Sequence, residues 1–233
     1  MCFLKELFAK SKRFSFDLHK AFPDDCESSV KLLRLLSAAN DIVFLQRLYL
    51  DYAHQKDDVG KEVKHAEGNF ILLLAMGFLR EGLSAFKHLY EDPAAKKLFP
   101  KLDKEGREAL SFLESETYGA TSLHEDVLKD IRDDATFHYQ YGSYVKALCS
   151  IRQHTGHFII GQTPAATRFL IADDIRSEIV RSSIDFSRPD DNDVRDRTER
   201  IFKAMGRLVS FSHWFLIAYL DEHHIEVISD NND

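Results

Sequence analysis

A long apolar segment at residues 61–90 constrains the fold more than any other part of the sequence. Its apolar residues lie nearly all round the middle of an α-helix, which is typical of a helix covered by other helices. Asp92-Pro93 follows, and the helix should end there because proline disfavours helical geometry in the residue before it. We predict that this segment is the central helix; its apolar residues are Phe70, Ile71, Leu72, Leu73, Leu74, Met76, Phe78, Leu79, Leu83, Phe86 and Leu89.

Other segments have the periodicity of amphipathic helices. They lie at residues 30–52, 103–116, 123–138 and 174–184, in a helix through Val145 and Ile151 that should end by Gly156, and in a last long helix at 194–223. Apolar residues make up 44% of the 233 residues, with only 10 Gly and 5 Pro, so the composition is that of an ordered globule poor in turns. We therefore predict an all-α fold, a multi-helix bundle with long central helices, in a single domain over residues 1–233.

One short segment and the last helix differ from the other amphipathic helices of the predicted bundle. Residues 157–171 should form a small β-hairpin, because two short apolar runs flank Gly161-Gln162-Thr163-Pro164. The last helix is apolar on two sides, so we expect it to sit deep in the bundle or to serve a dimer contact. The two sides carry Phe202, Met205, Val209 and Leu216, and Ile201, Leu208, Phe211 and Phe215.

Cysteine content, charge and hydropathy restrict location and partners. The three cysteines are widely separated and form no C-x-x-C pair, which argues against a disulfide framework or a thiolate zinc site and favours a reducing compartment. The amino terminus does not have the pattern of a signal peptide, and the runs at 70–79 and 208–220 are shorter than the roughly 20 residues of a membrane span. We expect a cytoplasmic protein without a membrane partner.

The formal net charge of -7 argues against a broad basic surface that binds duplex nucleic acid. A local basic pocket remains compatible with this net charge.

The segment with the most chemical content begins at Arg132. Asp133 follows the arginine directly, and His138 lies six positions after it. This pattern resembles the HEPN superfamily, helical bundles with an R-x4-6-H motif in which a polar residue usually follows the arginine. The resemblance covers the motif and the general likeness of a helical chain that carries it in a later helix. It implies that Arg132, Asp133 and His138 occupy the motif positions.

In active members the motif pairs across a homodimer and forms a metal-independent ribonuclease site, while other HEPN-like chains bind nucleotides or act as interaction modules. The resemblance therefore implies RNA or a nucleotide as the ligand, a homodimer, and no cofactor. The residue types fit this chemistry, since histidine can accept a proton near neutral pH and arginine can bind the phosphate. Asp133 would orient either partner.

Helix geometry restricts how these residues meet. Residues six apart in a straight helix are separated by about 9 Å along the axis and roughly 120° around it. Arg132 and His138 therefore need a composite site at a twofold axis, or an arginine just before a helix that Asp133 or Asp134 caps.

Local ion pairing is the open alternative for the same residues. Asp134 and His138 are four apart, as in a helix-surface pair, and Arg132 can pair with Asp130 or Glu125. On that interpretation the chain is a noncatalytic helical interaction or nucleotide-binding protein, whose apolar carboxy-terminal helix supplies the interface with a protein partner.

Other candidate sites have weaker patterns. Glu62 and His65 have the Glu-x-x-His spacing of carboxylate-bridged metal sites, but one copy is half a site, and similar spacings at 51–54 and 221–224 lie near helix ends; we predict no metal site. We expect His213 to be a core histidine and Cys149 a buried structural thiol. Phosphate-loop, dinucleotide, nucleophile-elbow and H-E-x-x-H signatures are absent from the sequence.

Overall fold

A computed structural model describes residues 13–22, 27–54, 61–119, 121–128, 141–151, 170–183 and 191–230. The fold is all-α, as predicted, with three long helices: α3 (Glu27–His54), α4 (Lys61–Tyr90) and α10 (Asp191–Glu222). The central helix α4 has the predicted bounds. The shorter elements are α2 (Leu18–Ala21), α5 (Pro93–Lys96), η1 (Phe99–Lys101), α6 (Lys104–Thr117), η2 (Leu123–Val127), α8 (Tyr141–Ile151) and α9 (Leu170–Ser183).

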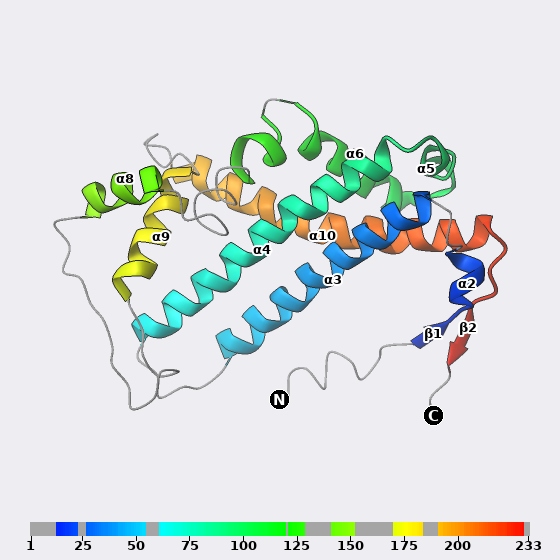
Figure 1. Cartoon of the computed structure of the whole chain (residues 1–233), viewed down its shortest axis with the longest axis horizontal. Helices are drawn as coiled ribbons and strands as arrows, with labels where there is room; N and C mark the ends of the chain where they lie inside the picture. The colour runs from blue at the N-terminus through cyan, green and yellow to red at the C-terminus, as the bar shows by residue number, and fades with distance from the viewer. Residues whose placement is uncertain are drawn as a thin grey trace.

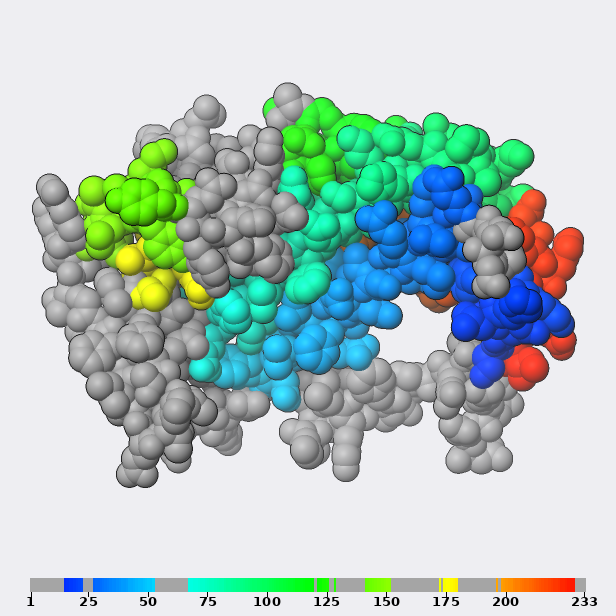
Figure 2. All heavy atoms as spheres, viewed as in Figure 1, coloured from blue at the N-terminus to red at the C-terminus, as the bar shows by residue number. Residues whose placement is uncertain are grey.

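The three long helices form the body of the bundle (Figure 1). Consecutive helices α3 and α4 run antiparallel and side by side, and Figure 2 shows their surfaces as adjacent stripes on one face. Helix α10 crosses behind both of them, and α6 packs along α10. Helices α8 and α9 pack on each other at one end, where α9 also contacts α4.

The core follows from the helical spacing of the apolar residues. Helix α3 buries Leu32, Leu35, Ile42 and Leu45 on one side, and α4 is buried on several sides. Full burial of each such side chain contributes roughly 1.5–3 kcal/mol. At Gly82 a Cβ atom would lie 2.5 Å from Cδ2 of Leu208, so the glycine allows α4 and α10 to approach closely.

The last helix is buried mainly on one of the two apolar sides seen in the sequence. Ile201, Leu208, Phe211 and Phe215 are all in the core. On the other side Met205 is buried as well, whereas Phe202 is 45% exposed. The expectation that this helix sits deep in the bundle is confirmed for the first side.

Helix α4 ends at Tyr90, just before the predicted break, and Asp92 caps the next helix. The buried Asp92 carboxylate accepts hydrogen bonds from the backbone N–H groups of Ala94 (2.8 Å) and Ala95 (3.2 Å) and from the Lys31 ammonium (2.8 Å). Burial alone would raise the pKa of Asp92, but Lys31 and the two N–H groups hold it below its usual value. The contact between Asp92 and Lys31 therefore joins the end of α4 to the start of α3.

Within the part of the chain that the structure describes, one helical stretch, Glu67–Tyr90, is long and apolar enough by length and composition to cross a membrane. The apolar run at 70–79, taken alone, is shorter than a membrane span. A central core helix has the same composition, and 56% of the apolar window is buried inside the protein. Helix α4 contacts α3, α6, α9 and α10. These contacts bury the larger part of its apolar window in the core.

The hairpin prediction is wrong at its carboxy-terminal end. Leu170 and Ile171, expected in the second strand, begin helix α9, and residues 157–169 lie outside the described residues. Ile171, Ile175 and Ile179 are spaced four apart, so the helical period outweighs the short apolar run. Two unpredicted strands, β1 (Arg13–Ser15) and β2 (Ile228–Asp230), pair antiparallel, with Phe14 opposite Ser229.

Candidate functional site

The three residues of the R-x4-6-H pattern, Arg132, Asp133 and His138, lie outside the described residues. The chain is described up to Leu128 and again from Tyr141. Leu128 is fully buried in the core, and Tyr141 begins α8. The described element that precedes the motif in the chain is η2.

Element η2 is a single π-helical turn that a buried carboxylate holds in place. The Glu116 side chain, at the end of α6, accepts two hydrogen bonds from Arg200 of α10, at 3.2 and 2.7 Å, and one from the Leu123 N–H at 3.3 Å. Arg200 also donates to the Thr121 carbonyl at 3.1 Å. This network joins α6, α10 and the first residue of η2. Single π-turns occur often at functional sites.

His124 lies on this turn, with both ring nitrogens in hydrogen bonds. Its Nε2 is 2.9 Å from Oγ of Ser84 on α4, and its Nδ1 is 2.8 Å from Oε1 of Glu125. A carboxylate only accepts, so Nδ1 carries the proton and Nε2 of the neutral ring accepts from the Ser84 hydroxyl. Burial lowers the pKa of His124, although Glu125 acts in the opposite direction. The neutral imidazole is therefore the form near pH 7.

Two cations of α4 flank Ser84. Arg80 is one helical turn before it and Lys87 nearly one turn after it, and the charges of both contribute to lowering the pKa of His124. The Nε atom of Arg80 is buried and has no hydrogen-bond partner among the described residues, and a guanidinium nitrogen lies 3.9 Å from the Glu81 carboxylate. The cluster thus combines a hydroxyl, a neutral imidazole, a carboxylate and two positive charges.

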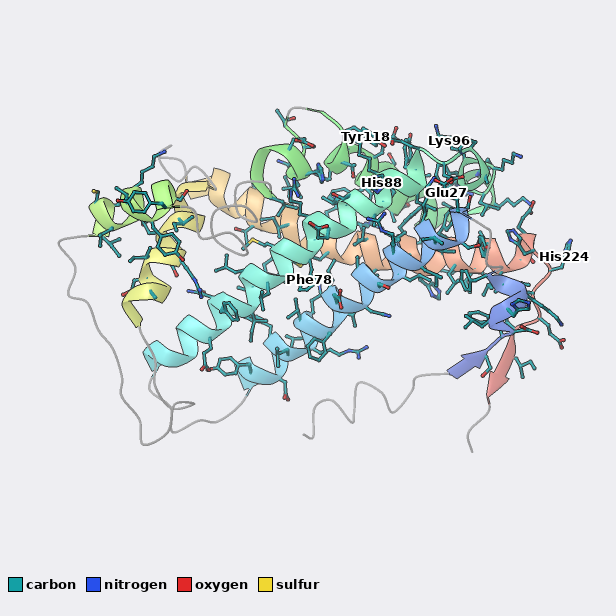
Figure 3. All side chains as sticks on the ribbon, in the orientation of Figure 1. Glu27, Phe78, His88, Lys96, Tyr118 and His224 are labelled. Atoms are coloured by element: carbon teal, nitrogen blue, oxygen red, sulfur yellow. The ribbon has the colours of Figure 1, made fainter. Side chains whose placement is uncertain are left out.

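Beyond this cluster, the end of α4 is aromatic, and Figure 3 labels Tyr118 and Lys96 there. The Lys87 ammonium lies 5.6 Å from the centroid of the Tyr118 ring, and the Tyr118 hydroxyl donates to Glu91 at 3.2 Å. Burial and the neighbouring Glu91 carboxylate raise the pKa of Tyr118, so its phenol stays protonated. These contacts hold Lys87 beside the polar cluster.

No group of three or more metal-ligating side chains occurs within the described ranges. The side chains of Glu62 and His65 are outside what the structure describes. Near the end of α10, Glu222 pairs with Lys101, and Nδ1 of His223 is 2.8 Å from the Tyr219 carbonyl oxygen. These two side chains have structural partners of their own.

Two single-residue expectations are wrong. His213 is exposed and packs edge-on against Trp214, with ring centroids 4.9 Å apart, so it is not a core histidine. Cys149 is exposed, so it is not a buried thiol. Helix phase explains both exposures. Phe211 and Phe215, on either side of His213, face the core, and Ala147 and Ile151, on either side of Cys149, do the same.

An apolar groove lies between α3, α4 and α10, at the end of the bundle away from α5. It has a volume of about 250 Å³. None of the residues that line it is charged: Leu45, Gln46, Tyr49, Leu50, Ile71, Leu72, Ala75, Phe202 and Met205. The exposed Phe202 ring is on its α10 side.

The polar cluster was not found from the sequence. Ser84 and His124 are 40 residues apart, and Glu116 and Arg200 are 84 apart, so no local motif joins either pair. The sequence predicts a role for Glu125 only as a pairing partner of Arg132.

Comparison with protein-family models, curated proteins and solved structures finds no match for this chain.

Proposed function

We propose that this chain is a HEPN-like cytoplasmic protein that binds RNA and cleaves it without a metal ion. In this proposal Arg132 holds the phosphate, His138 accepts the proton of the attacking 2′-hydroxyl, and Asp133 orients one of them. The observation that carries the proposal is the Arg-Asp-x4-His pattern in an all-α chain.

The surroundings of the motif in the chain support the proposal. Arg132 follows the buried Leu128 by four residues, and His138 precedes the start of α8 by three. The turn before Leu128 contains His124, which is affected by the charges of Arg80 and Lys87. These two cations suit contact with a phosphate backbone, and the Glu125 carboxylate beside His124 offsets part of their charge.

A homodimer is part of this proposal. Residues six apart would lie on different sides of a straight helix, so two copies of the motif that face each other would bring Arg132 of one chain to His138 of the other. We expect a twofold axis close to the motif.

Cleavage of a mixed single-stranded RNA in EDTA tests the proposal. Purified wild-type protein should cleave it, and Arg132→Ala and His138→Ala should each lose activity by at least about 10²-fold with folding intact. Exposed His213 supplies a matched control, since His213→Ala removes a histidine remote in sequence from the motif and should cleave as wild type. Wild-type protein without activity, or variants that cleave equally, would refute the ribonuclease proposal.

The second candidate function is a noncatalytic helical interaction protein. The apolar groove of α3, α4 and α10 favours it, because its uncharged lining suits the apolar face of an amphipathic partner helix. On this proposal Phe202→Glu abolishes partner binding, and RNA cleavage is absent from the wild type.

A further inference from the structure

We propose that Ser84, His124 and Glu125 form a nucleophile, base and orienting carboxylate that hydrolyse small carboxylic esters. This activity goes beyond the proposed action on RNA and does not depend on it. Hydrogen bonds join the three side chains across α4 and η2.

The order of these hydrogen bonds is that of an activated nucleophile. The Ser84 hydroxyl lies 2.9 Å from Nε2 of His124, and Nδ1 on the other side of the ring lies 2.8 Å from the Glu125 carboxylate. Both distances are within the range expected between a nucleophile, its base and the group that orients the base. Glu125 fixes the tautomer that leaves Nε2 free to take the serine proton.

Burial suits each group to its role. The His124 side chain is 8% exposed, so its ring is held in one place, while that of Glu125 is 47% exposed and keeps its charge in contact with water. Ser84 is half-buried, which leaves the hydroxyl at the boundary of the core. Glu116 fixes the turn by accepting the Leu123 N–H.

Burial lowers the pKa of His124 and so keeps the ring neutral near pH 7, and the charged groups around it act on that pKa in both directions. From α4 these are Arg80 and Lys87, from η2 Glu125, and α6 contributes Glu116, whose charge is paired with Arg200. Arg80 lies one helical turn from Ser84 with no hydrogen bond on its Nε among the described residues. In this proposal the positive charge of Arg80 stabilises the oxyanion that forms at Ser84.

The reaction proceeds in two balanced steps. In the first, Oγ of Ser84 bonds to the ester carbonyl carbon while its proton passes to Nε2 of His124; the carbon–oxygen bond to the alcohol then breaks, and the alcohol leaves with that proton. In the second, water attacks the acyl-serine, His124 takes a proton from the water and returns it to Oγ, and the carboxylic acid is released. Ester and water become acid and alcohol, with no other reactant.

Labelling with an alkyl fluorophosphonate tests the nucleophile directly. The full-length wild-type protein should gain one phosphonyl group on the peptide of residues 81–87, which contains no other serine. Ser84→Ala should remain unlabelled, whereas the matched control Ser115→Ala, which removes an exposed serine of α6, should be labelled as wild type. An unlabelled wild type, or a label on any other residue, would overturn the proposal.

Hydrolysis of p-nitrophenyl acetate tests the roles of the other two groups. Ser84→Ala and His124→Gln should each reduce the rate to background, a loss of about 10²-fold or more. Glu125→Gln should fold normally and hydrolyse slowly, and the acid limb of its pH profile should move to lower pH because Glu125 raises the pKa of His124. A Glu125→Gln rate and pH profile identical to wild type, with labelling intact, would overturn the role assigned to Glu125 as the group that orients His124.

Discussion

The ion pair between the buried Glu116 and the partly exposed Arg200 gives the sharpest test of how the polar cluster is held. The Glu116 side chain is 7% exposed and accepts three hydrogen bonds, two from Arg200 and one from the Leu123 N–H. Glu116→Ala removes all three and leaves a buried N–H group and a guanidinium without their acceptor. The free energy of unfolding should fall.

The magnitude follows from the exposure of the two partners. Removing one member of a fully buried ion pair costs roughly 3–5 kcal/mol. The Arg200 side chain is 38% exposed and keeps its hydrogen bond to the Thr121 carbonyl, so water can solvate part of the lost charge. We expect a loss of about 2–3 kcal/mol for Glu116→Ala, with at least about 1 kcal/mol of coupling to Arg200→Ala.

Urea unfolding followed by circular dichroism measures these values in a double-mutant cycle. Glu108 and Arg207 provide the control, because they join the same two helices at 3.8 Å but are 51% and 30% exposed. Glu108→Ala should change the free energy of unfolding by no more than about 0.5 kcal/mol. A Glu116→Ala loss no larger than that of the control, or no coupling to Arg200, would refute the reasoning.

Three further changes test the core. Asp92→Ala should lower the free energy of unfolding by about 2 kcal/mol at pH 7, because the cap of α5 and the acceptor of Lys31 are lost. Since the folded pKa of Asp92 is lowered, the stability of the wild type over the variant should shrink below about pH 4. Thermal unfolding measured against pH tests this, and a difference that stays constant with pH would contradict it. Gly106→Ala should lower the melting temperature, because a Cβ there would lie 2.9 Å from Cβ of Trp214. Gly206→Ala should raise it, because this helical glycine has open space around it. Equal shifts in the two variants would contradict this packing. Tyr219→Phe should cost about 1–2 kcal/mol in urea, because its hydroxyl lies 2.8 Å from both a buried serine and a backbone carbonyl, and a neutral effect would show that these bonds contribute nothing.

The long helices could be predicted because their signal is local. Apolar residues three and four apart marked α3, α4 and α10, and Pro93 marked the end of the central helix. The same reasoning failed where helix phase matters more than composition. Cys149 and His213 lie in apolar stretches, yet each falls on the outward side of its helix.

The polar cluster could not be predicted because it depends on tertiary packing. His124 meets Ser84 only when η2 packs on α4, and Glu116 meets Arg200 only when α6 packs along α10. A local reading of residues 123–138 favoured one regular helix, whereas residues 123–127 form a π-turn. The β1–β2 pair joins segments from opposite ends of the chain, which local patterns do not reveal.

The most direct test of the proposed RNA site is complementation between two inactive variants. Arg132→Ala and His138→Ala proteins are each assayed on single-stranded RNA in EDTA, then mixed under conditions that exchange subunits and assayed again. A composite site leaves one intact arginine–histidine pair in each mixed dimer, so the mixture should recover up to half of the wild-type activity on those dimers. A mixture as inactive as its components, beside an active wild type, would contradict a site shared between two chains, and an inactive wild type would contradict the RNA proposal itself.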